Sequence, residues 1–66
     1  MKEPIVDREK WRIAEAVKAA CAQAGLEAFE HAAISGLCFE GSLECAVGAI
    51  QAVNVGEIIR ELDDGE

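Results

Sequence analysis

The chain has few bulky side chains. Among its 66 residues are no tyrosine, one tryptophan and two phenylalanines, although 52% of the residues are hydrophobic. Many of these hydrophobic residues are alanine, which favours helix and buries little area per side chain. A single domain of this size needs disulfides, a metal, very regular helix packing or oligomerisation to be stable. The composition therefore favours closely spaced helices over a bulky globular core.

Positive charge is almost absent from the second half of the chain. Residues 34–66 contain one cation, Arg60, against seven carboxylates, a net charge of −6, whereas residues 1–33 contain five cations against six carboxylates, a net charge of −1. The total of −7 repels phosphate, so we expect neither a nucleic-acid partner nor an anionic membrane as partner. The acidic charge is compatible with a basic protein partner. The simpler interpretation is that the acidic end keeps the protein in solution.

Export and membrane signals are also missing. The start, MKEPIVDREK, is charged and no apolar segment follows it, so we expect no signal peptide. The longest uncharged stretch, Cys45 to Gly56, is too short and too rich in glycine and asparagine to span a bilayer. Three cysteines without an export signal predict free thiols and a cytoplasmic location.

The sequence shows no catalytic motif. One histidine and two serines in predicted turns do not form a Ser-His-Asp set, and no glycine-rich phosphate loop is present. A chain this short does not wrap a substrate pocket alone. We therefore expect no catalytic residue and no cofactor, and an enzyme is not the favoured interpretation.

Apolar residues recur with helical period from Asp7 onward. The pattern predicts one long helix over about residues 7–34, with Gly25 inside it at a cost of roughly 1 kcal/mol. The alternative is a break at Gly25 and a new helix from Leu26, which lies on the polar side of a continuous helix. The residues of the stripe are Ile13, Val17, Ala20, Cys21, Ala24, Ala28 and Ala32.

Ser35-Gly36 predicts a helix stop in which Gly36 takes the left-handed conformation and Leu37 supplies the following apolar contact. Ser42 is a candidate N-cap for a second helix, although that helix could start one turn earlier. Asn54 and Glu57 form a capping-box pattern that predicts a third helix over about residues 55–62. No segment alternates with period two, so we predict no strand.

These patterns predict an all-α fold: a helical hairpin of a long and a shorter helix plus a short third helix. Residues 1–6 are expected to be disordered, residues 7–62 to form one helical domain, and residues 63–66 to form an acidic tail. Leu43, Val47 and Ile50 are expected to pack against the long helix. Two copies are expected to form a dimer resembling a four-helix bundle.

The segment SLECAVGAIQAV has one formal charge, Glu44, and a helix so apolar needs neighbours on two faces. Homodimerisation or a protein partner would supply them. The expected interface is either the small-residue face of the second helix or an aromatic flank of the long helix. The candidate interface residues are Cys45, Gly48, Ala49 and Ala52 on the small face, and Trp11 and Phe29 on the flank.

His31, Cys38 and Cys45 are the only candidate metal ligands of the zinc type, but their spacing of seven and seven lacks the close cysteine pair of structural zinc sites. Cys45, near the start of the second helix, is also a candidate reactive thiol, because a helix N-terminus favours the thiolate. The simpler interpretation is that His31 borders the core of the long helix and that both cysteines are small buried apolar residues.

The segment AFEHAAISGLCFEGSLECAVGAI, residues 28–50, resembles a group of very short bacterial helical proteins of unassigned function, some of which are automatically labelled acetyltransferases. The resemblance rests on Glu30, Glu44 and the motif SGLCxEG of residues 35–41. It implies only that this turn is more than a connector. A separate, weaker alternative is that the chain is an accessory subunit that contributes this turn to an acyl-transfer enzyme.

The leading interpretation is a small non-enzymatic interaction or accessory protein that acts as a homodimer or as a subunit of a larger complex. The first alternative is a redox or zinc-linked role centred on Cys38, Cys45 and His31. The acyl-transfer subunit is the second alternative.

Overall fold

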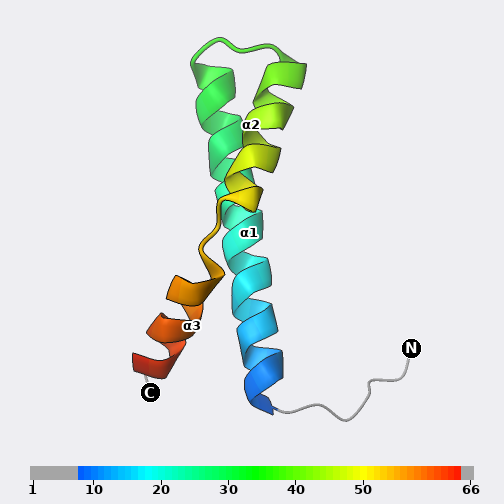
Figure 1. Ribbon diagram of the computed structural model, residues 1–66. Coiled ribbons are helices and arrows are strands. Elements are labelled where there is room, and N and C mark those ends of the chain that lie inside the picture. The colour runs from blue at the N-terminus through cyan, green and yellow to red at the C-terminus, as the bar shows by residue number, and fades with distance from the viewer. Residues whose placement is uncertain (1–7, 65–66) are drawn as a thin grey trace, which may run out of the picture.

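The computed structural model describes residues 8–64, which form three helices: α1 (Arg8–Ile34), α2 (Phe39–Gln51) and α3 (Val55–Asp64). α2 returns antiparallel to α1 and packs along its C-terminal half, and α3 continues in the same direction beside the N-terminal half (Figure 1). Residues 8–64 contain no strand, so the predicted all-α class is confirmed. The predicted disorder of residues 1–6 and the end of the predicted tail, residues 65–66, lie outside the described residues.

α1 is continuous through Gly25, as the sequence favours, and its 27 residues make a helix of about 40 Å. Gly25 is one of only two buried residues of α1. A Cβ at this position would lie 2.9 Å from Cδ1 of Ile50 and 3.8 Å from the carbonyl oxygen of Ala46. The glycine is therefore explained by the close approach of α2, which a side chain would obstruct.

Small residues form the seam between α1 and α2. The buried residues of the described chain are Gly25, Ala32 and Ser42. The sequence predicts Leu43, Val47 and Ile50 in this place, but in the structure only Ile50 reaches Gly25, and Leu43 and Val47 are each 47% exposed. Two helix backbones come close only where their side chains are small, and this displaces the larger side chains to the edge of the contact.

The stop after α1 has the geometry that the sequence predicts. Gly36 has a φ of 100°, its N–H donates to the carbonyl of Ala33 at 3.1 Å, and the N–H of Leu37 donates to the carbonyl of Ala32 at 3.0 Å. These two bonds define a Schellman motif, in which the left-handed residue is glycine because it has no Cβ.

Gly36 and Gly48 make a matched pair for testing this stop, because an added Cβ at either position would meet no atom within 4 Å. Gly36→Ala should lower the free energy of unfolding by about 1–2 kcal/mol, since a positive φ is strained for alanine. Gly48→Ala, inside α2, should raise it by about 0.5–1 kcal/mol. Urea titration followed by circular dichroism measures both changes. Equal effects of the two substitutions would contradict the assigned role of Gly36.

α2 begins at Phe39, which confirms the alternative of a start one turn earlier. Ser42 as N-cap is therefore wrong. Cys38 is the N-cap: its Sγ accepts from the N–H of Gly41 at 3.4 Å. Its carbonyl accepts from the N–H of Ser42 at 2.9 Å, which places Ser42 within the helix. A cysteine in the position usually held by serine or aspartate gives no strong capping signal, so the sequence favours the later start at Ser42.

α3 starts where the capping pattern predicts. The side-chain oxygen of Asn54 accepts from the N–H of Glu57 at 2.9 Å, and the helix continues two residues beyond the predicted end. Its apolar residues Ile58, Ile59 and Leu62 are half-buried. α3 lies beside the N-terminal half of α1, away from the end where α1 turns into α2 (Figure 1).

Candidate functional site

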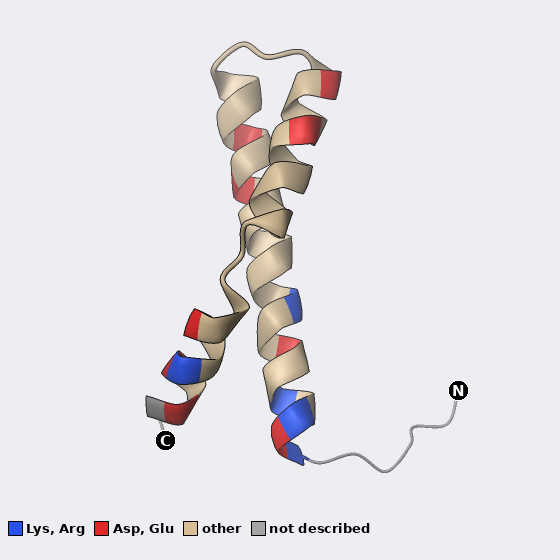
Figure 2. Ribbon diagram, viewed as in Figure 1, with Lys and Arg blue, Asp and Glu red and all other residues tan. Residues whose placement is uncertain are grey.

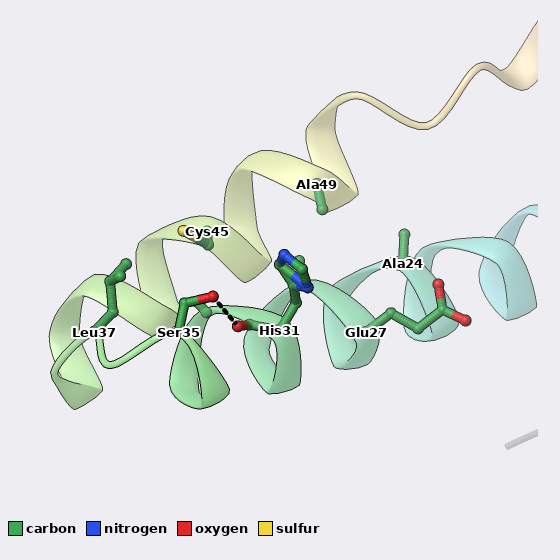
Figure 3. Close-up of a pocket in the computed structure, with 9 residues that line it drawn as sticks. Ala24, Glu27, His31, Ser35, Leu37, Cys45 and Ala49 are labelled. Atoms are coloured by element: carbon green, nitrogen blue, oxygen red, sulfur yellow. Dashed lines mark hydrogen bonds between the residues drawn. The ribbon is translucent and has the colours of Figure 1, made fainter.

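A groove of about 720 Å³ runs between α1 and α2 on one side of the hairpin (Figure 3). Alanines from both helices form much of its surface, and four polar or ionisable side chains border it. The lining residues are Ala24, Glu27, Ala28, His31, Ala32, Ser35, Leu37, Cys45 and Ala49. The groove follows from the small-residue seam, because short side chains leave the space between two close helices unfilled. We call this side of the hairpin the groove face.

The groove brings together two of the three predicted metal candidates. His31 from α1 and Cys45 from α2 both border it, whereas Cys38 does not. Within residues 8–64, no group of three or more histidine, cysteine or acidic side chains is placed to hold a metal ion. A site built from His31 and Cys45 would therefore need ligands from another molecule, since zinc takes four.

The remaining polar groups of the groove already have local partners. The Ser35 hydroxyl donates to the carbonyl of His31 at 2.9 Å, and Glu27 accepts from the amide of Gln23 at 3.0 Å. These bonds connect neighbouring turns of α1 and its end. They do not arrange a nucleophile beside a base, which catalysis of acyl transfer requires.

All three cysteines are free thiols in the structure: Cys21 is half-buried, and Cys38 and Cys45 are exposed. Cys45 therefore is not the buried apolar residue that one interpretation of the sequence predicts. The sulfur of Cys38 caps α2, so this thiol has a structural role although it is exposed.

Five of the seven residues of the SGLCFEG turn have a local structural role. Ser35 bonds back to α1, Gly36 makes the left-handed stop, and Cys38 caps α2. Leu37 lies against Gly41, whose Cβ would be 3.3 Å from Cδ2 of Leu37. The motif that carries the family resemblance thus has the geometry of a tight connection between two helices.

Sequence inspection gives no sign of Ser42 as a seam residue. Only 1% of Ser42 is exposed, and its hydroxyl has no hydrogen-bond partner. A buried hydroxyl without a partner is unfavourable by about 1–3 kcal/mol. Its small size explains its presence, because a larger side chain would separate α1 and α2.

The predicted interface residues occupy both sides of the hairpin. On the small face, Cys45, Gly48 and Ala52 are exposed, and Ala49 is half-buried in the groove. On the aromatic flank, Trp11 is 46% exposed. Phe29 is half-buried and packs edge-to-face on Phe39 of α2, with 5.7 Å between the ring centroids.

No protein-family profile matches the chain, and no curated protein or solved structure shows significant similarity to it. Within residues 8–64, no single helix is long and apolar enough to cross a membrane. α2 and the adjoining part of α3 reach the required length and composition only together, and they are bent by 50° where they meet.

Proposed function

We propose that this chain is a small, non-enzymatic interaction protein of the cytoplasm that works as a homodimer or as a subunit of a larger assembly. One observation supports the proposal above all: Ala32 is the only buried hydrophobic side chain of the described residues. A single alanine does not supply a core, because stability comes mainly from apolar area removed from water. Contact with a second molecule would supply the missing burial.

The exposed apolar side chains support the same proposal. Nine large hydrophobic residues of the described chain are between 41% and 87% exposed. Monomeric proteins rarely leave contiguous apolar patches of more than a few hundred Å² open to water. The residues are Trp11, Leu26, Ile34, Leu37, Phe39, Leu43, Val47, Ile50 and Val55.

Sedimentation velocity from 1 to 200 µM, combined with circular dichroism over the same range, tests self-association. We expect the mass to rise from 7.0 kDa to twice that value, and the helix signal and unfolding midpoint to rise with it. A helical species that stays at 7.0 kDa and unfolds cooperatively at every concentration would contradict the homodimer.

The redox or zinc-linked role is a second candidate, because the groove brings His31 and Cys45 to one site and Cys45 is exposed. Metal analysis after purification without added zinc tests the metal version, and chelator should then unfold the protein. Thiol-labelling rates test the redox version. Cys45 should react faster than a cysteine in a short peptide, and an equal or slower rate would count against it.

A further inference from the structure

The side of the hairpin opposite the groove carries large apolar side chains from both helices. Leu43 lies two residues before Cys45, which borders the groove, and two residues turn about 200° around a helix. Phe29 of α1 and Phe39 of α2 are in ring contact on this side and join the two helices. We call this surface the apolar face. Its residues are Leu26, Phe29, Phe39, Leu43, Val47 and Ile50.

Most of the apolar face is open to water. Leu26 is 60% exposed, Phe39 is 69% exposed, and Ile50, which reaches Gly25, is still 41% exposed. Together the residues of the face expose on the order of 500 Å², near the upper end for the largest patch of a monomeric protein. A partner seated on the face would bury about 1,000 Å² over both molecules, the lower limit of a specific interface. A specific complex therefore needs a further attraction besides apolar contact.

The charged residues that border the apolar face are carboxylates. Glu30, Glu40 and Glu44 each directly follow a residue of the face in sequence, and all three are exposed. Residues 19–59 contain no lysine or arginine. Carboxylates alone mark the end where α1 turns into α2 (Figure 2). The apolar face is thus set in a surface of one sign of charge.

The cations of the described residues lie away from this surface. Arg12, Lys18 and Arg60 each pair with a carboxylate three residues earlier in their own helix, at 3.5–3.9 Å. Lys10 lies about 30 Å from Glu30 along α1, well beyond the distance of about 8 Å over which physiological salt screens a charge. The chain therefore brings little positive charge of its own to the border of the apolar face.

We propose, on the basis of the interaction function proposed above, that the apolar face binds an amphipathic helix of a partner protein whose apolar stripe is flanked by lysine and arginine. The apolar stripe of the partner covers the face, and its cations approach Glu30 at one edge and Glu40 and Glu44 at the other. The occupant is a helix because residues 8–64 contain no strand that could pair with an extended segment. Rows of side chains four residues apart, such as Leu43 and Val47, are the rows on which a further helix packs.

A second copy of the chain is a poorer occupant of the same face. It would add its own Glu30, Glu40 and Glu44 to the border, and like charges around one apolar contact weaken it. Salt screens this repulsion and also screens the attraction of a cationic helix. Self-association through the apolar face should therefore strengthen with salt, whereas binding of the cationic helix should weaken. Both occupants cover the same residues, so the cationic helix should displace the second copy.

A synthetic peptide tests the proposed partner chemistry. The probe is a fluorescein-labelled helix of about 18 residues, with leucine at i, i+4 and i+7, lysine on both flanks and alanine elsewhere. The control peptide carries glutamate in place of every lysine and keeps the leucine stripe. Fluorescence anisotropy should show one lysine peptide bound per chain, with a dissociation constant roughly 10-fold higher in about 300 mM than in about 50 mM salt. The glutamate peptide should bind at least about 10-fold more weakly at the lower salt concentration.

Two valines of equal exposure locate the binding surface. Val47 lies on the apolar face and is 47% exposed, and Val55 begins α3 and is 45% exposed. Val47→Ala should weaken binding of the lysine peptide roughly 3- to 10-fold, because it removes apolar area from the contact. Val55→Ala removes the same two methyl groups elsewhere and should change the dissociation constant less than about twofold.

Two pairs of carboxylates separate local from overall charge. Glu30→Gln/Glu44→Gln should weaken binding of the lysine peptide roughly 5- to 20-fold at about 50 mM salt and flatten its dependence on salt. Glu27→Gln/Glu61→Gln makes the same change in net charge, with Glu27 on the groove face and Glu61 on α3. This control should weaken binding less than about threefold, because its charges do not border the apolar face.

Each outcome decides between the two proposals. Equal binding of the lysine and glutamate peptides, or equal effects of a test variant and its control, would overturn the cationic partner. Self-association, which sedimentation measures without peptide, would then stand. A chain that binds the lysine peptide as predicted but stays monomeric at 200 µM would remove the homodimer and support the partner. A chain that neither binds the peptide nor self-associates would overturn both.

Discussion

Val47→Glu is expected to weaken dimerisation roughly 100-fold or more, and to lower the helix signal only as far as the loss of dimer does in the unmodified chain at the same dimer fraction. Val47 follows Phe39 and Leu43 at intervals of four on α2, and these three side chains form an exposed apolar stripe. Val47 is 47% exposed, so the monomer can hold a carboxylate there without burying it in the hairpin. In the dimer, the same carboxylate would lose its water against Phe and Leu side chains, and the change occurs once in each copy. Sedimentation velocity gives the dissociation constant, and circular dichroism at matched concentration reports the helix content.

Gly48→Glu is the matched control, because it introduces the same charge one residue further along α2, on another side of the helix. Gly48 is exposed, and a Cβ there would meet no atom within 4 Å. Dimerisation of this variant should change less than about threefold if the apolar stripe of Phe39, Leu43 and Val47 forms the interface. The opposite ranking, with Gly48→Glu the more disruptive, would assign the interface to the small-residue face of α2.

The helix ends of this fold are predictable from sequence wherever a local chemical rule fixes them. Gly36 has a positive φ, which favours a residue without Cβ. The side-chain oxygen of Asn54 accepts from the N–H of Glu57 and so caps α3. The start of α2 is less predictable, because Cys38 is a weak acceptor and an uncommon cap. Each of these rules depends on neighbours within four residues.

The packing of α2 on α1 is not predictable from hydrophobicity alone. The larger residues Leu43 and Val47 form the stronger apolar stripe, yet Gly25, Ala32 and Ser42 occupy the seam. The free energy of packing α2 on α1 depends on how closely the two backbones approach. The distance between the backbones is set by the side chains of both helices together. The groove, which brings His31 and Cys45 to one place, is a consequence of that approach and is equally hidden in the sequence.

Gly25→Leu is expected to lower the free energy of unfolding by about 2–3 kcal/mol, which is a large fraction of the stability of so small a domain. A Cβ alone would already lie 2.9 Å from Cδ1 of Ile50, and the leucine would add three further carbons at the closest point of the seam. Ala19→Leu is the control: Ala19 is exposed on α1, so the same side chain should change the stability by less than about 0.5 kcal/mol.

The smaller substitution Gly25→Ala separates the packing effect from helix propensity. Alanine gains about 1 kcal/mol of helix propensity, and only the flexible end of Ile50 obstructs its methyl group, so the two effects should nearly cancel. Shortening the obstructing side chain by Ile50→Val removes Cδ1, and Gly25→Ala should then stabilise the protein by up to about 1 kcal/mol. Urea unfolding of the four variants of this double-mutant cycle measures the coupling. Strict additivity would show that Gly25 does not contact α2 in solution.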